Sequence, residues 1–331
     1  MAFSRVCISM NPFVHYTCLG SSLFHVNFTP RIPAFTTTFR SLTLSASLSA
    51  QHSGDHSSDP PLLTVKPSWK PFWKPTCLYF TQGKCTLMDD AFHLGKFDHS
   101  CSVPLEAELA KSDKLRPQNI DFLLVLDLEG KVEILEFPVV IIDAKTMQAV
   151  DFFHRFVRPS NMSEQMINQY IEGKYGKLGV DRVWHDTAIS FEEVIQEFEA
   201  WITRHQLWEK ELGGPLRKAA FVTCGNWDIK TKIPQQCQVC GMKIPSYFME
   251  WINIKDVYLN FYNRRASGMK TMLNDLKIKL LGSHHLGIDD TKNIARVVQR
   301  MLADGAVMKI TARRKLDSPE SVEFLFKNRI K

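Results

Sequence analysis

Residues 122–144 have the sequence FLLVLDLEGKVEILEFPVVIIDA, and this stretch decides the fold class. Its first part, FLLVLDLE (122–129), is an apolar run that ends in acids, as is typical of a buried strand. Its second part, VEILEFPVVIIDA (132–144), predicts a second strand. The connection between the two is short, which favours an antiparallel pair because parallel strands need a crossover of a dozen or more residues.

The elements further along the chain change in type. FFHRFVRP (152–159) predicts a third strand, and AAFVTCG (219–225) predicts a fourth. FEEVIQEFEAWITRH (191–205) and MKTMLNDLKIKL (269–280) have the periodicity of helices. Strands that come first and are followed by alternating helices and strands predict an α/β domain with a mixed sheet, which we place at residues 120–310.

A cluster of histidines and aspartates lies near the end of this domain. The stretch HHLGIDDTKNIARVVQRML begins at His284, and its apolar positions recur at i, i+3 and i+4. This spacing predicts a helix whose first turn carries Asp289 and Asp290, beside a loop that carries His284 and His285. Imidazole and carboxylate groups at one helix end are suited to metal-assisted chemistry with a general base.

Three further acids stand at the ends of expected elements. Asp127 and Glu129 are two residues apart, so they share one face of the first strand, and Asp228 follows the fourth strand. Each acid has a structural alternative, such as a strand end facing water, a helix N-cap for Asp228, or a favourable dipole interaction for Asp290. Together they predict a site for two divalent cations, because hard cations prefer several oxygen ligands.

The order D-x-E, a later Asp, and then H-x4-D resembles the DEDDh exonuclease family of the ribonuclease H-like fold. The similarity is closer to the Eri-type subfamily, which includes the three-prime histone mRNA exonuclease, here as an organellar plant member. It extends over about residues 121–304, with these similar stretches: LLVLDLE, EILEFPVVIID, FVRP, GNWDIK, QQCQ, WINIK and HHLGIDDTKNIARVVQRML.

This resemblance implies a mixed five-stranded sheet flanked by helices and 3′→5′ hydrolysis of RNA with two Mg²⁺ or Mn²⁺ ions, releasing 5′-mononucleotides. The implied metal ligands and general base are Asp127, Glu129, Asp228, Asp290 and His285. The resemblance also suggests that Glu136 faces the terminal sugar, although a structural role is an equal alternative. Trp227 is expected either to pack against the end of the substrate or to be a core aromatic residue.

The alternatives for function come from two classes. One is an RNA-binding module on a non-catalytic nuclease scaffold, and the other is a DNA-directed 3′→5′ exonuclease. The expected RNA substrates are ribosomal RNA precursors or small RNAs. Two segments depart from the family pattern: the loop after Glu129 is short, and residues 161–184 match the usual Leu-Thr-Gly-Ile region poorly.

A small Cys/His segment occupies residues 77–101. CLYFTQGKC and FDH in it resemble a CCCH zinc finger, but the third cysteine of that pattern is replaced by Gly95, so His93 or Cys101 would have to substitute. Zinc with four N/S ligands is one interpretation, and a solvated linker is the other. Tyr79 and Phe80 would then offer stacking surfaces to RNA. The expected zinc ligands are Cys77, Cys85, His93 and His99.

The N-terminal region differs from the rest of the chain in composition. Of the 331 residues, the first 54 contain no Asp or Glu, and they are rich in Ser and Thr. This composition is typical of a transit peptide, which we place at residues 1–50, with import into the chloroplast expected and the mitochondrion or cytoplasm as alternatives. The remaining divisions are linkers at 51–76 and 102–119 and a basic C-terminal tail at 311–331.

The overall charge and hydropathy limit the classes of partner. A formal net charge of +6 at pH 7 suits a polyanion such as RNA, although a solvated basic surface explains the charge equally well. The chain has no run of 18 or more apolar residues, so we expect no membrane span. No obligate protein partner is evident from the sequence.

Overall fold

The structure is a computed structural model, and it describes residues 74–100, 103–105, 109, 113–315, 317–318 and 320–330. The expected transit peptide (1–50), most of the linker at 51–76 and Cys101 lie outside the described residues. Among the described helices, none is long and apolar enough to cross a membrane.

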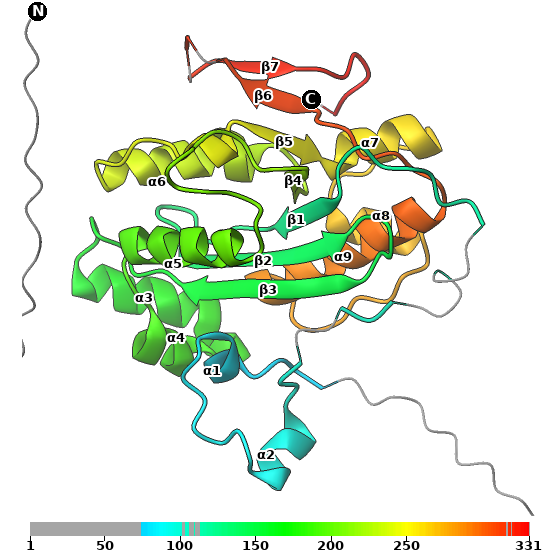
Figure 1. Ribbon diagram of the computed structural model, residues 1–331. Helices are drawn as coiled ribbons and strands as arrows, with labels where there is room; N and C mark the ends of the chain where they lie inside the picture. Colours follow the sequence, from blue (N-terminus) through cyan, green and yellow to red (C-terminus); the bar gives the residue numbers. More distant parts are fainter. Residues whose placement is uncertain are drawn as a thin grey trace, which may run out of the picture. The chain divides into compact units, whose positions relative to one another are not determined.

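A mixed sheet of seven strands in the order β3-β2-β1-β4-β5-β6-β7 forms the centre of the described domain (Figure 1). Strand β1 pairs antiparallel with β2 and parallel with β4, which confirms the expected hairpin and the mixed α/β fold class. The strands are β1 (Phe122–Leu126), β2 (Glu136–Asp143), β3 (Ala149–Phe156), β4 (Ala219–Thr223), β5 (Glu250–Asn253), β6 (Ala312–Arg314) and β7 (Val322–Phe324).

The helices lie on both faces of this sheet and at one end of it (Figure 1). A π-helical turn, η3 (Asp228–Lys232), leads directly into α6, and two 3-10 turns are η2 (Gly176–Leu178) and η4 (Ser246–Phe248). The α-helices are α1 (Leu78–Thr81), α2 (Ala91–Lys96), α3 (Glu164–Tyr175), α4 (Asp181–Thr187), α5 (Phe191–Arg204), α6 (Ile233–Val239), α7 (Ile254–Tyr262), α8 (Met269–Asp275) and α9 (Gly287–Ala303).

Strand β1 is buried on both faces, which is why its sequence is a continuous apolar run. Leu123 and Val125 face one core, formed with α7, α8 and α9. Leu124 and Leu126 face the other core, formed with α5 and α6. Because side chains alternate across a strand, a strand between two helical layers needs apolar residues at every position. The carboxylates that follow β1 are thereby held at the edge of a rigid core.

The sheet has two strands more than the five that the family resemblance implies. Strands β6 and β7 come from residues 311–331, which the sequence suggests are a basic tail. Each is three residues long, too short for its periodicity to be recognised. Arg314 on β6 is buried, and its guanidinium donates to the carbonyl oxygens of Ile229 (2.6 Å) and Lys230 (2.7 Å). The Arg314 guanidinium is therefore engaged inside the protein and is not exposed to a phosphate backbone.

Helices α3 and α4 occupy the segment 161–184, where no element was expected. Ser163 caps α3 by accepting a hydrogen bond from the Met166 amide, and Ile167, Ile171 and Tyr175 are buried at i, i+4 and i+8. This periodicity is present in the sequence but is obscured by the polar residues between.

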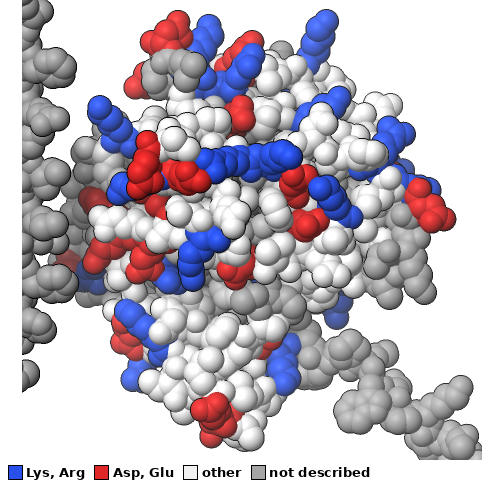
Figure 2. All heavy atoms as spheres, viewed as in Figure 1, with Lys and Arg blue, Asp and Glu red and all other residues white. Residues whose placement is uncertain are grey.

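Basic and acidic side chains are intermingled on the face of the molecule that Figure 2 shows. Among the described residues, basic and acidic side chains also form ion pairs, such as Arg155–Glu197 and Arg158–Glu164. The positive net charge therefore does not gather into one patch on this face, and charge alone gives no RNA-binding surface there.

Candidate active site

Two acids, Asp127 and Glu129, directly follow the end of β1. Glu129 extends the pairing with β2, because its amide donates to the carbonyl oxygen of Glu136 at 3.2 Å. Gly130 follows with φ +123°, and a Cβ there would collide with the carbonyl oxygen of Glu133, so the chain can turn here only with glycine. This tight turn fixes the direction in which Asp127 and Glu129 project.

The first turn of α9 supplies the fourth acid of the motif, and the loop before this helix supplies both histidines. Asp290 Oδ2 accepts a hydrogen bond from the backbone amide of His285 at 2.8 Å, and His284 Nδ1 lies 2.9 Å from the same oxygen. His285 has φ +72°, and its exposed ring stacks on that of His284 with centroids 3.8 Å apart. The sequence suggests that His284 is only a loop neighbour, but it contacts Asp290 directly.

Asp228 begins the π-helical turn η3 that follows β4. Its Oδ1 accepts a hydrogen bond from the Leu128 amide at 3.0 Å, which ties the third acid of the motif to the first two. Lys232, at the end of η3, is buried and donates to two backbone carbonyls of the short loop after Glu129, each at 2.8 Å. Single π-helical turns occur frequently at functional sites. Here the turn joins the β4 end to the β1 end.

The carboxylates converge closely enough to repel one another. One oxygen from each of Asp127, Glu129 and Asp290 lies within 4.8 Å of the others. Burial, followed by the charges of Asp228 and Glu129, raises the pKa of Asp127 well above its usual range. Burial also raises the pKa of Glu129 to about 7 and that of Asp228 to about 6. A largely buried group of hard oxygen donors with excess negative charge fits divalent cations such as Mg²⁺ or Mn²⁺.

Helix α3 adds a cation that the sequence did not predict at this site. Lys174 Nζ lies 2.7 Å from Glu129 Oε2 and donates to the His285 carbonyl oxygen at 3.2 Å. It comes from the GKYGKLG part of the segment that departs from the family pattern. That departure from the family pattern was the signal available in the sequence. Only the fold of α3 shows that Lys174 reaches Glu129.

Glu136 is enclosed by protein groups. Its side chain is fully buried, and its carboxylate accepts hydrogen bonds from the Tyr175 hydroxyl (3.0 Å) and the Ile288 amide (2.8 Å). His154 Nε2 lies 3.0 Å from the same carboxylate. This burial and these contacts favour the structural alternative for Glu136 over the expected contact with the terminal sugar.

Trp227 lies at the surface beside Asp228. Its side chain is 45% exposed, and the Lys232 ammonium lies 5.3 Å from the ring centroid. The core-aromatic alternative therefore fails for Trp227, and its ring is available to a ligand.

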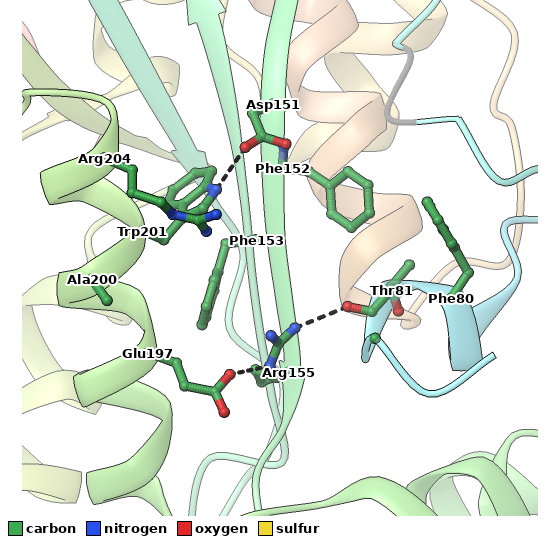
Figure 3. A pocket seen from close by; sticks show the side chains of 11 residues that line it. Phe80, Thr81, Asp151, Phe152, Phe153, Arg155, Glu197, Ala200, Trp201 and Arg204 are labelled. Carbon is green, nitrogen blue, oxygen red and sulfur yellow. Dashed lines mark hydrogen bonds and ion pairs between the residues drawn. The ribbon is translucent and has the colours of Figure 1, made fainter.

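The Cys/His residues also come together, away from the carboxylates. Ligand atoms of Cys77, Cys85, His93 and His99 all lie within 4.8 Å of one another. The two aromatic residues expected to stack on RNA are engaged within the protein, since Tyr79 donates to Asp186 and the Phe80 ring stacks on His99. A cavity of about 600 Å³ between α1, β3 and α5 has none of the acidic motif residues in its lining (Figure 3).

The mixed sheet, with acids at the ends of β1 and β4 and in the first turn of α9, defines a ribonuclease H-like protein of the DEDDh exonuclease class. Comparison with known proteins agrees: a sequence model described as RNase_T, exonuclease, matches residues 123–298, more than half of the chain. The chain belongs to this exonuclease family, whose 3′→5′ members are hydrolases acting on phosphodiester bonds.

Several relatives of the chain have exonuclease or exoribonuclease in their names. An exonuclease domain-containing protein of Arabidopsis thaliana is 66% identical over 255 residues, covering 77% of this chain and 76% of the relative. Human ERI1 exoribonuclease 3 is 30% identical over 219 residues, covering 62% and 61%. Human 3′-5′ exoribonuclease 1 is 30% identical over 234 residues, covering 70% and 60%, so the match spans less than two thirds of these two relatives.

Two solved structures are similar as well. A 3′-exonuclease in a structure of histone mRNA stem-loop recognition has a TM-score of 0.53 and 27% identity, covering 63% of this chain and 92% of that chain. The full-length 3′-exonuclease has a TM-score of 0.53 and 28% identity, covering 63% and 68%. These similarities support the assignment of the fold.

Proposed function

We propose that this chain is a metal-dependent 3′→5′ exoribonuclease with Asp127, Glu129, Asp228 and Asp290 as metal ligands and His285 as the general base. The observation that carries this proposal is the convergence of buried and half-buried carboxylates beside an exposed histidine in the loop before α9. The names of the two human relatives, both exoribonucleases, support RNA as the substrate class.

The carboxylates, His285 and Trp227 have different roles in the proposed reaction. When bound to the four carboxylates, two divalent cations would lower the pKa of water and stabilise negative charge on the leaving oxygen. Burial and the neighbouring His284 lower the pKa of His285, so its ring is neutral at pH 7 and can accept a proton. The hydrogen bond from its backbone to Asp290 anchors the loop while leaving the ring exposed. Trp227 offers a stacking surface next to Asp228.

The decisive test uses a 5′-labelled single-stranded RNA with Mg²⁺. We expect stepwise shortening from the 3′ end, with release of 5′-mononucleotides. Asp127→Asn and Asp290→Asn should lower kcat by about 10³-fold or more, and His285→Ala by about 10²-fold to 10⁴-fold. Asp121→Asn is the matched control, because Asp121 precedes the opposite end of β1 and pairs with Lys145 at the surface. Full activity in Asp127→Asn or Asp290→Asn would overturn the proposal.

The same assay separates the two alternatives. A DNA strand of identical sequence, cleaved as fast as the RNA, would favour a DNA-directed exonuclease, since recognition of the 2′-hydroxyl is what distinguishes RNA. Retention of the RNA without any shortening would favour the binding module. The complete set of acids and the neutral histidine support catalysis.

The site of action and the natural substrate are a separate part of the proposal. The acid-free, Ser/Thr-rich N-terminus supports import into the chloroplast, where ribosomal RNA precursors and small RNAs with 3′ extensions are the proposed substrates. Residues 1–73 fused to a fluorescent protein should accumulate in chloroplasts. Fluorescence that stays in the cytoplasm or enters mitochondria would contradict this localisation. Sequencing of organellar RNA 3′ ends in cells lacking the protein tests the substrate.

A further inference from the structure

We propose that Cys77, Cys85, His93 and His99 bind one structural zinc ion, which holds the segment 74–100 against the nuclease domain. The four side chains come from different parts of this segment: the residue before α1, the loop after it, α2 and the chain beyond α2. The proposal concerns a metal site separate from the acidic centre and does not depend on nuclease activity.

The distances between the ligand atoms match the edges of a zinc tetrahedron. Zinc bonds of about 2.3 Å to sulfur and about 2.0 Å to nitrogen give edges of about 3.6 Å for S···N and about 3.3 Å for N···N. Cys85 Sγ lies 3.5 Å from His93 Nε2 and 3.8 Å from His99 Nε2. The two Nε2 atoms are 3.0 Å apart. Cys77 Sγ completes the group within 4.8 Å.

Hydrogen bonds alone account poorly for this arrangement. A hydrogen bond between the Nε2 atoms of His93 and His99 uses one proton, because each neutral imidazole has a single N–H. Both Nε2 atoms also lie close to Cys85 Sγ. A cation placed between the four atoms satisfies both imidazole lone pairs and both thiolates at once.

The surrounding contacts orient the ligands. The Asp90 side chain caps α2 by accepting a hydrogen bond from the His93 amide at 2.6 Å. The Phe80 ring stacks on His99 with an interplanar angle of 4°. The Cys77 amide donates to the Asp98 carbonyl oxygen at 3.0 Å, which brings the two ends of the segment together. The ligand geometry is therefore supported from outside the metal position.

The segment has little apolar core of its own. Helix α2 has no buried residue, and Phe92 on it is 72% exposed. Small units that bury so little surface usually need disulfides or a metal to remain folded. Zinc binding supplies folding free energy directly, because the ligand set exists only in the folded chain. A structural ion thus explains why this segment folds as it does.

The segment packs on β3 through buried polar groups. Thr81 Oγ1 lies 2.7 Å from His154 Nδ1, and Gln82 Oε1 accepts from the Phe156 amide at 3.0 Å. Arg155 donates to the Thr81 carbonyl oxygen at 2.9 Å, as Figure 3 shows. Thr81 and Gln82 are both at least 95% buried. Losing the zinc would expose these groups and remove the partners of His154.

A chain of contacts leads from this packing to the acidic centre. His154 Nε2 lies 3.0 Å from Glu136 Oε1, and that oxygen accepts a hydrogen bond from the Ile288 amide at 2.8 Å. Ile288 is two residues before Asp290 on α9. His154 and Glu136 are fully buried, so water cannot replace a lost partner. Zinc is therefore expected to position α9 without touching substrate.

The test measures zinc in the full-length protein, purified with zinc and reductant and dialysed against metal-free buffer. We expect about one zinc per chain. The zinc content per chain should be at least tenfold lower in Cys85→Ala and His99→Ala than in the wild type, whereas Asp127→Asn should keep the wild-type content. Cys240→Ala is the matched thiol control, since Cys240 follows α6 and does not belong to the Cys/His group, and it should also keep the zinc.

A second measurement guards against variants that fail to fold. Co²⁺ added to the metal-free wild-type chain should give a thiolate-to-cobalt charge-transfer band and the ligand-field spectrum of a tetrahedral ion. Wild-type protein without zinc and without this band would overturn the proposal, as would zinc retained in both Cys85→Ala and His99→Ala. For the coupling to α9, Cys85→Ala should cleave RNA about tenfold more slowly and unfold at lower temperature.

Discussion

At the scale of single residues, Lys174 is the basic side chain that contacts both Glu129 and the loop of His285. Its ammonium lies against Glu129 Oε2 and spans to the carbonyl of His285, so one cation contacts both the ligand group and the loop of the general base. Burial raises the pKa of Glu129 to about 7, and the charge of Lys174 acts in the opposite direction. Lys174 thus helps to keep Glu129 ionised near neutral pH.

Removing this cation should change the pH dependence of cleavage. Glu129 must be ionised to hold a metal, and in Lys174→Met its pKa rises further, so the acidic limb of the kcat/KM profile should move to higher pH by about one unit. Lys177→Met is the control, because Lys177 is exposed one turn away on η2. A limb that stays in place or moves to lower pH would show that Lys174 does not act on Glu129.

At the scale of elements, the turn η3 joins three parts of the site. It begins at Asp228, ends at buried Lys232, and continues into α6 at Pro234, which has no amide hydrogen to donate. Arg314 of β6 donates to two of its backbone carbonyls. The short C-terminal strands therefore stabilise the element that positions the third acid.

This arrangement predicts unequal effects for two adjacent arginines. Arg314→Leu leaves the carbonyl oxygens of Ile229 and Lys230 without these donors, so the free energy of unfolding should fall by about 3 kcal/mol. Arg313→Leu removes an exposed pair with Glu323 and should cost less than about 1 kcal/mol. Urea unfolding measures both. Equal losses would contradict the structural role of Arg314, and cleavage should fall only in Arg314→Leu.

At the scale of the whole molecule, the acidic centre opposes folding when no metal is bound. Burial raises the pKa of Glu129 to about 7, and those of Asp228 and Asp289 to about 6. A carboxyl group whose pKa is higher in the folded state binds its proton more tightly there. Its stabilising contribution is complete below the unfolded pKa and is lost as the pH rises through the folded pKa.

The melting temperature of the magnesium-free protein should therefore fall by roughly 5 °C between pH 5 and pH 7.5, and Mg²⁺ should restore it at pH 7.5. Dialysis without chelator leaves a zinc ion in the Cys/His segment undisturbed. Asp228→Asn removes one of the buried charges, so its melting temperature should fall less over the same range. A melting temperature that is constant or rises with pH would show that these carboxylates are not destabilising.

The sequence predicted the acids of this site better than their surroundings. Asp127, Glu129, Asp228 and Asp290 stand at element ends, where apolar runs and helical periodicity stop, so a linear pattern could locate them. For Glu136 the sequence left a substrate contact and a structural role open, because a strand residue in a short family motif does not show which groups its carboxylate will contact. Lys174 was missed since its helix lies in a segment of weak apolar pattern.

The amino-acid sequence by itself determined the hairpin of β1 and β2, the mixed α/β class and the acids that follow strands, because strand burial and side-chain period are local properties. Only the tertiary structure decided that Lys174 meets Glu129, that His154 and Tyr175 enclose Glu136, and that Arg314 supports η3. These contacts join residues far apart in the chain, and they form only when the packing of helices against the sheet fixes their distances.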